Sequence, residues 1–340
     1  GNLDYLDEVV EFYDGSQATV WEHIKKSIDF CMANLGEHGF PLMLCSDWND
    51  MLYKVCREGK GESIWTSMQF GTVLRMIAQL AELKGEDKQK YLDIYEQQKK
   101  LVNEIAWDGD WYRRCITDEG RFIGSKNEPQ AKIWLNTQSW AVISGMGDKA
   151  ETAMDSVKKY LDTELGIKKI DPSMKDYPSK EDPLTYYNKG CGENGSVFCH
   201  ANTWAIIAEC ILKRPQNAYK YYHQLLPMVA QAKAGEWRYK AEPYVYASNI
   251  FGPESDKFGL ANVSWLTGTA AWMYVAVTQY MFGIKPKWDG LEIDPCLPEE
   301  MLPAKVTREF RGCKYDITIT KNQKVFIPHE DGRKTYTMKI

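Results

Sequence analysis

The chain has 340 residues, 44% of them hydrophobic, and a formal net charge of −5 at neutral pH. This length can bury a large core in one domain or two, and the acidic balance excludes a general basic surface for nucleic acid or anionic membranes. The apolar runs are too short to span a bilayer, and the first residues do not place an apolar stretch after a basic one. We therefore expect a globular protein with neither a nucleic-acid nor a membrane partner.

Helical periodicity dominates the first five-sixths of the sequence. Apolar residues recur at three- and four-residue spacing over 19–35, 63–85 and 87–107, with acidic residues or serine near each start. This spacing predicts three helices. The next segment, 109–124, alternates and contains turn residues, which predicts a small hairpin inserted between helices.

Three later segments, 136–147, 200–210 and 264–283, start with small and polar residues and continue as runs that are apolar on most sides. Such runs are typical of helices packed all around. The more amphipathic segments 148–165 and 216–227 follow the first two. This alternation predicts an α/α toroid, in which inner helices line a core, outer helices cover them, and loops at one end form the pocket.

The character of the sequence changes near its C-terminal end. A stretch rich in Pro, Asp and Gly is followed by alternating β-branched and polar residues, which predicts a small β-rich segment. We therefore divide the chain into a helical domain, 1–285, and a C-terminal β-rich segment, 286–340.

The nine cysteines are an odd number spread along the chain, without the dense pattern of a disulfide framework. A reduced, cytoplasmic setting fits this usage best. The closest cluster, Cys191 and Cys199 with His200, lacks the paired spacing of structural zinc sites, so we expect no metal.

The segment SDWND places Asp47, Trp48, Asn49 and Asp50 on a connection leading into or between helices, where functional residues are often displayed. Asp47 and Asp50 are three residues apart, so on a helical turn they would share a face, although one of them could serve only as a cap. A capping cluster beside a packed tryptophan explains this segment as well as an active site does.

Aromatic residues are abundant, with 12 Trp and 20 Tyr. Their flat apolar faces and polar tips suit the stacking of sugar rings. They suit ordinary core packing equally well, so the composition alone does not decide between the two uses.

Four further motifs follow SDWND in the sequence: ENGSVFCHANTW, AEPYVY, SWLTGTAAW and YMFGIKPKWDGLEIDPCLP. Together the five resemble the inverting disaccharide phosphorylases of glycoside hydrolase family 94, the cellobiose and chitobiose phosphorylases and their relatives. The resemblance implies an (α/α)6 barrel, of which this chain forms a part. It also implies phosphorolysis of a β-linked, cellobiose-like disaccharide, which yields an α-sugar-1-phosphate and a monosaccharide.

The same resemblance implies roles for individual residues. Asp50, the second acid of DWND, is the expected general acid. His200, Thr267 and Gly268 are expected to hold inorganic phosphate, the co-substrate. Glu193 is expected to contact the acceptor sugar, and the other expected substrate contacts are Trp48, Cys45 and Tyr187.

These residue types suit the chemistry on physical grounds. An inverting hydrolase needs two carboxylates, one as the acid and one to activate water, whereas phosphate is already an anionic nucleophile and needs only donors that position it. A single acid then suffices. It must stay protonated near neutral pH, which a partly buried, aromatic-walled site would favour. We expect no metal or organic cofactor.

Members of this family are much longer and place an N-terminal β-sandwich, a helical linker and the first barrel helices ahead of DWND. We therefore expect this chain to be the C-terminal half of such an enzyme, completed by the missing N-terminal half, and family resemblance favours a homodimer. An open barrel would otherwise expose apolar helix faces, which soluble proteins rarely leave bare.

Substrate identity is open at this stage. Gly192 stands where cellobiose-type members often carry lysine, and Ser248 stands near the position of an expected glutamine. The lysines at 175, 180 and 189 could accept an anionic acceptor such as an aldonic acid. Chitobiose, cellodextrin and cellobionate therefore remain alternatives to cellobiose.

Two other functional classes also remain. An inverting glycoside hydrolase on the same barrel would need a base, for which Glu193 and Glu242 are candidates. A non-catalytic carbohydrate-binding fragment would bind sugar without turnover.

Overall fold

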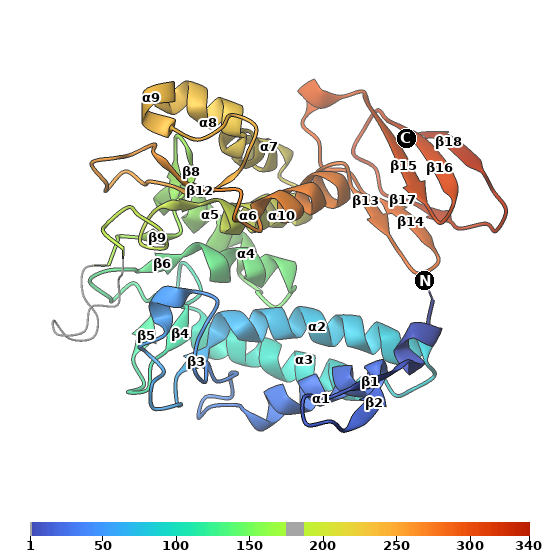
Figure 1. Ribbon diagram of the computed structural model, residues 1–340, viewed down its shortest axis with the longest axis horizontal. Coiled ribbons are helices and arrows are strands. Elements are labelled where there is room, and N and C mark those ends of the chain that lie inside the picture. Colours follow the sequence, from blue (N-terminus) through green and yellow to red (C-terminus); the bar gives the residue numbers. More distant parts are fainter. Residues whose placement is uncertain (1, 175–186) are drawn as a thin grey trace.

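The computed structural model describes residues 2–174 and 187–340. Its N-terminal third is a layer of three helices that lie side by side (Figure 1): α1 (Val20–Ala33), α2 (Ile64–Leu83) and α3 (Gln89–Leu101). Polar side chains fix where the first two begin. Thr19 and Glu22 form a capping box at α1, and the Ser63 hydroxyl accepts the Thr66 N–H at 3.1 Å at the start of α2.

These helices confirm the three predicted over 19–35, 63–85 and 87–107, although the third changes to a π-helix at Val102–Ala106. The predicted hairpin is also confirmed, but it is shorter than 109–124. Its strands are β4 (Cys115–Ile116) and β5 (Phe122–Ile123), and β3 (Glu62–Ser63) pairs with β4 as a third strand.

Four helices form an inner series in which each contacts the next: α2, α4 (Leu135–Ile143), α6 (Cys199–Ile211) and α10 (Thr269–Val275). Outer helices cover the first three, α3 on α2, α5 (Ala150–Tyr160) on α4, and α7 (Pro215–Leu225) on α6. The alternation of inner and outer helices agrees with the predicted α/α toroid. The chain forms part of an (α/α)6 barrel.

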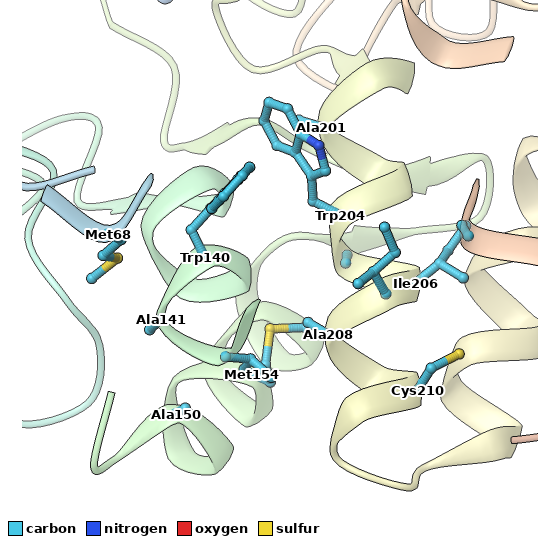
Figure 2. Packing of buried hydrophobic residues seen from close by; sticks show 14 of the residues in the cluster. Met68, Trp140, Ala141, Ala150, Met154, Ala201, Trp204, Ile206, Ala208 and Cys210 are labelled. Carbon is cyan, nitrogen blue, oxygen red and sulfur yellow. The ribbon is translucent and has the colours of Figure 1, made fainter. Parts of the chain in front are cut away.

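Side-chain size explains how closely the inner helices approach. Figure 2 shows Trp140 of α4 and Trp204 of α6 side by side between their helices, with ring centroids 5.5 Å apart. Below them Met154 of α5 points toward Ala208 of α6, where a larger residue would keep the helices apart. All four of these side chains are buried, and Trp140, Trp204 and Ala208 belong to the predicted apolar runs.

One helix boundary was predicted wrongly. The segment 264–283 does not begin as a helix, because β12 (Ala261–Ser264) pairs with β11 (Ala247–Ile250) and Trp265 has a φ of +71°. A residue in that region cannot continue a right-handed helix. α10 therefore starts at Thr269 and passes into a π-helix at Ala276–Met281.

A short strand directly precedes three of the inner helices. β3 leads into α2, β6 (Ile133–Trp134) into α4, and β10 (Val197–Phe198) into α6. The functional loops predicted from the sequence lie at the N-terminal ends of these helices. The remaining elements of the helical part are η1 (Asp4–Asp7), β1 (Val9–Glu11), β2 (Gln17–Thr19), η2 (Asp50–Leu52), β7 (Asp162–Thr163), β8 (Gly166–Ile167), β9 (Ile170–Asp171), α8 (Pro227–Ala234) and α9 (Glu236–Tyr239).

The C-terminal residues form two three-stranded sheets that lie apart from the helices of the N-terminal layer (Figure 1). Their alternating burial, clearest in β16, agrees with the predicted β-rich segment, while the domain boundary at 285/286 stays a prediction. None of the described helices has the length and apolar character needed to cross a membrane. The strands are β13 (Ile284–Pro286), β14 (Gly290–Ile293), β15 (Ala304–Phe310), β16 (Cys313–Ile319), β17 (Val325–Pro328) and β18 (Thr335–Lys339), with η5 (Glu299–Met301) between β14 and β15.

Candidate active site

The two acids of SDWND have separate environments. The Asp47 side chain is 1% exposed and forms an ion pair with Arg114, which is fully buried. Its second oxygen accepts the Ser63 hydroxyl at 3.2 Å. Asp50, by contrast, is exposed at the start of η2. The two acids do not share a helical face, because the chain becomes helical only at Asp50.

Asp50 faces a cleft of 310 Å³. This cleft collects every predicted site residue except Cys45, which is exposed elsewhere on the same loop. Its walls include the SDWND segment, the start of α6 and the loop before α10, which are far apart in the sequence. The cleft is lined by Trp48, Asp50, Tyr187, Glu193, Phe198, His200, Ser248, Leu266, Thr267 and Gly268.

His200 and Gly268 fit closely together at one end of the cleft. A Cβ atom on residue 268 would lie 2.8 Å from Cε1 of His200 and 2.9 Å from its Nδ1, so only glycine leaves room for the imidazole. The ring also packs against Trp48 and Trp204, with centroids at 5.3 and 4.8 Å. These contacts fix the orientation of the imidazole. Its Nε2 is buried without a hydrogen-bond partner among the described residues.

Burial, together with the smaller effect of the nearby Lys169 cation, lowers the pKa of His200 to about 4. The imidazole is therefore neutral at pH 7, with one ring nitrogen that donates a hydrogen bond and one that accepts. Beside it, the Thr267 hydroxyl lies 2.6 Å from the Thr269 hydroxyl and accepts the Thr269 N–H at 3.2 Å. The imidazole of His200 and the Thr267 hydroxyl can therefore bind an anion by donating hydrogen bonds, although neither carries a charge.

Glu193 occupies another wall and is 4% exposed. Its Oε1 accepts a hydrogen bond from Asn49 Nδ2 at 3.2 Å and pairs with the ammonium of Lys169. Its Oε2 accepts the backbone N–H of Met51 at 3.0 Å. Glu193, the predicted contact of the acceptor sugar, is thus also hydrogen-bonded to the two residues that flank Asp50.

The sequence analysis did not identify Lys169 and Arg114 as residues of the site. Both are fully buried, and they pair with Glu193 and Asp47, respectively. Each has a neighbour of like charge, Lys168 or Arg113, that is partly exposed. No local pattern shows which member of either pair turns inward. A charged residue inside an apolar stretch, as in GIKKID, is the only available signal, and it is weak.

Tyr187 separates the cleft from a neighbouring cavity of 440 Å³ and lines both. Gly192 makes this possible, because a Cβ there would lie 2.4 Å from the Tyr187 ring. Burial raises the pKa of Tyr187, and the charges of Glu193 and Asp50 raise it further. Its hydroxyl is therefore a neutral hydrogen-bond donor and acceptor facing the cleft.

The lysines predicted for an anionic acceptor are only partly placed. Lys189 lines the neighbouring cavity together with Lys257, and Glu254 and Asp256 lie on the same wall. The two positive charges are thus matched by two negative ones. Lys175 and Lys180 lie outside the described residues.

The family described as "Glycosyl hydrolase 94 superfamily, catalytic domain" matches residues 1–283 of this chain. The chain belongs to this family. It is 36% identical over 324 residues to a solabiose phosphorylase of Paenibacillus borealis, in an alignment that covers 94% of this chain and 42% of that protein. It is 34% identical over 325 residues to an N,N'-diacetylchitobiose phosphorylase of Vibrio proteolyticus, covering 94% and 40%.

This family 94 chain therefore spans about two fifths of the length of these curated relatives. Among solved structures, a family 78 rhamnosidase of Bacillus sp. GL1 superposes with a TM-score of 0.53, covering 94% of this chain and 31% of that one. At 14% sequence identity this similarity concerns the fold alone.

Proposed function

We propose that this family 94 chain is the part of an inverting glycoside phosphorylase that carries the general acid and the phosphate site. The observation that carries the proposal is the cleft itself. It places one exposed carboxyl group, Asp50, in the same 310 Å³ space as His200, Thr267 and Gly268. This is one acid together with donors for an anion, as phosphorolysis requires.

The proposed reaction uses these residues as follows. An oxygen of inorganic phosphate attacks the anomeric carbon from the face opposite the glycosidic oxygen, and Asp50 donates its proton to that oxygen as the bond breaks. Inversion of a β-linkage then gives the α-sugar-1-phosphate and releases the second sugar. Phosphate brings its own negative charge, so no base is needed.

Asp50 is more exposed than a partly buried acid was expected to be. A general acid must hold its proton until the substrate arrives, and removal of water favours the neutral form. We therefore propose that the bound disaccharide, together with the remainder of the protein, covers Asp50 during the reaction. Trp48, Tyr187 and Phe198 supply the flat apolar surfaces on which a sugar ring packs.

A hydrolase is the weaker alternative. Glu193 has both carboxylate oxygens engaged by Asn49, Met51 and Lys169, which leaves it poorly placed to activate water. Glu242 accepts the Trp265 indole N–H at 3.1 Å and lines a different cavity. Neither candidate base therefore has the position that an inverting hydrolase needs.

For the substrate we propose a β-linked disaccharide, with cellobiose as the first candidate. The names of the relatives point to solabiose and N,N'-diacetylchitobiose as further candidates, and cellodextrin and cellobionate stay in the panel. The balanced charges around Lys189 give an anionic acceptor no special support.

We further propose that an N-terminal half completes the barrel. The two ends of the inner series support this, because apolar side chains are exposed there. Val73 and Met76 of α2 are 42% and 60% exposed, and Tyr274 of α10 is 62% exposed. A cytoplasmic homodimer without metal or organic cofactor is part of the same proposal, and light scattering and chelator treatment of the full-length protein would test it.

The deciding experiment measures sugar-1-phosphate formation by the full-length protein from this disaccharide panel, with and without inorganic phosphate. We expect product only with phosphate and its loss in the Asp50→Asn variant. Free sugar released without phosphate would make the protein a hydrolase. Binding of sugar with no turnover in either condition would indicate a non-catalytic carbohydrate-binding protein.

A further inference from the structure

We infer that the buried Lys169–Glu193 ion pair is a positioning device for the general acid, so that Lys169 acts on catalysis through Glu193 and the loop that carries Asp50. The inference rests on the proposed function, because it assigns Asp50 the role of acid. It gives Glu193 a task beyond contact with the acceptor sugar. Nothing in the sequence distinguished Lys169 from its neighbour Lys168.

The first step is the geometry of the Glu193 carboxylate. Oε1 accepts from the Asn49 side chain at 3.2 Å, and Oε2 accepts from the Met51 backbone N–H at 3.0 Å. These two residues immediately precede and follow Asp50 in the chain. A single carboxylate therefore holds the loop on both sides of the acid and limits how far Asp50 can move.

The second step is how Lys169 is held. Its backbone N–H donates to the Ser196 carbonyl at 2.8 Å, and its own carbonyl accepts the Leu135 N–H at 2.9 Å. These bonds connect it to the segments that lead into α6 and α4. The lysine is thus fixed to the inner-helix framework, while its ammonium pairs with Glu193.

The third step is that Lys169 does not face the substrate. Its Nζ lies 4.4 Å from the centroid of the Trp48 ring and 3.9 Å from that of Phe198, and the side chain is fully buried. Trp48 and Phe198 line the cleft, whereas Lys169 is not among the residues that line it. Lys169 is therefore a positioning residue and not a catalytic one.

The energetics make the pair act as a unit. Burial lowers the pKa of Lys169, and the charge of Glu193 opposes that shift. If Lys169 loses its charge, Glu193 becomes a buried carboxylate without a counter-charge. Such a group protonates or moves toward water. In either case its hydrogen bonds to Asn49 and Met51 weaken, and Asp50 loses its fixed position.

The test compares two substrates that differ in their need for the acid. The full-length protein and its variants are assayed with inorganic phosphate on the preferred disaccharide and on the 2,4-dinitrophenyl β-glycoside of the same donor sugar. Dinitrophenolate departs without protonation, so a misplaced acid leaves that substrate unaffected. We expect Lys169→Met to lower kcat on the disaccharide by about 10²-fold, the effect of a misplacement near 1 Å. Its kcat on the aryl glycoside should stay close to the wild-type value.

Three further variants complete the design. Lys169→Arg, which keeps the charge, should recover part of the lost activity. The double variant Lys169→Met/Glu193→Gln should lose no more than the worse single variant, because the two residues act together. Lys168→Met is the matched control, since that lysine is partly exposed and pairs with Asp171, and it should retain activity on both substrates.

Equal losses on both substrates in Lys169→Met would overturn the inference, because they would indicate a structural role alone. If Lys169→Met does not fold, Lys169→Gln carries the same comparison, with selective loss expected and equal loss against the inference. Asp50→Asn separates the two proposals. If Asp50→Asn lowers kcat equally on both substrates, the assigned acid is wrong and both proposals fail. If it is selective while the Lys169 and Glu193 variants are not, only the inference fails.

Discussion

Replacing Gly268 by alanine tests the phosphate end of the cleft. The backbone of Gly268 has φ −73° and ψ −2°, a conformation that alanine adopts without strain. Any effect must therefore come from the added methyl group. That carbon would lie 2.8 Å from Cε1 of His200.

The size of the disturbance follows from this distance. Carbon atoms in contact prefer a separation of about 3.5 Å or more, so the imidazole has to move by ~0.7 Å. Trp48 and Trp204 pack against the ring and restrict how it can do so. A displacement of this order costs up to about 10²-fold when it misplaces a reacting group. We expect kcat/KM for phosphate to fall by roughly 10- to 100-fold, with KM for the disaccharide much less affected.

The assay is the initial rate of phosphorolysis by the full-length protein at varied phosphate concentration. A double-mutant comparison identifies the cause, because Gly268→Ala should have little further effect once His200 has been replaced by alanine. A Gly268→Ala protein that keeps wild-type phosphate kinetics would refute the reasoning. So would a loss of the same size in the His200→Ala background.

Three other predictions follow from the site. The pKa of His200 is lowered to about 4 in the folded protein, so the unfolded chain binds the proton first as pH falls. The free energy of unfolding should therefore fall as pH drops from 6.5 toward 4. His200→Gln should flatten that dependence in urea titrations. Arg114→Met leaves Asp47 buried without its counter-charge and should lower the free energy of unfolding by about 3–5 kcal/mol, measured by chemical denaturation; an unchanged midpoint would contradict this. Thr267→Val should raise KM for phosphate by roughly tenfold or more, while Thr267→Ser retains the hydroxyl and the affinity.

Much of the fold was predictable because its signals are local. The helices over 19–35, 63–85 and 87–107 follow from apolar spacing within each segment, and the alternating strands near the C-terminal end follow from a period of two. The start of α10 was missed because it depends on a strand pairing. Ala247 of β11 is opposite Ser264 of β12, and this holds 264 in an extended conformation that its own sequence does not specify.

The predicted site residues were gathered by motif, and all but Cys45 line one cleft. The residues that organise the cleft were not predictable in this way. Asn49 and Glu193 are 144 residues apart, so no local pattern indicates that one bonds to the other. The same holds for Asp47 and Arg114, which are 67 residues apart.

By itself, then, the sequence determined the helical periodicity, the strand-rich C-terminal segment and the set of residue types suited to an acid and an anion. The tertiary structure alone decided that Asp47 is buried while Asp50 is exposed, and that Lys169 turns inward while Lys168 is partly exposed. The physical reason is that a charge can be buried only where an opposite charge meets it. That partner is supplied by a distant part of the chain, which comes near only when the helices have packed.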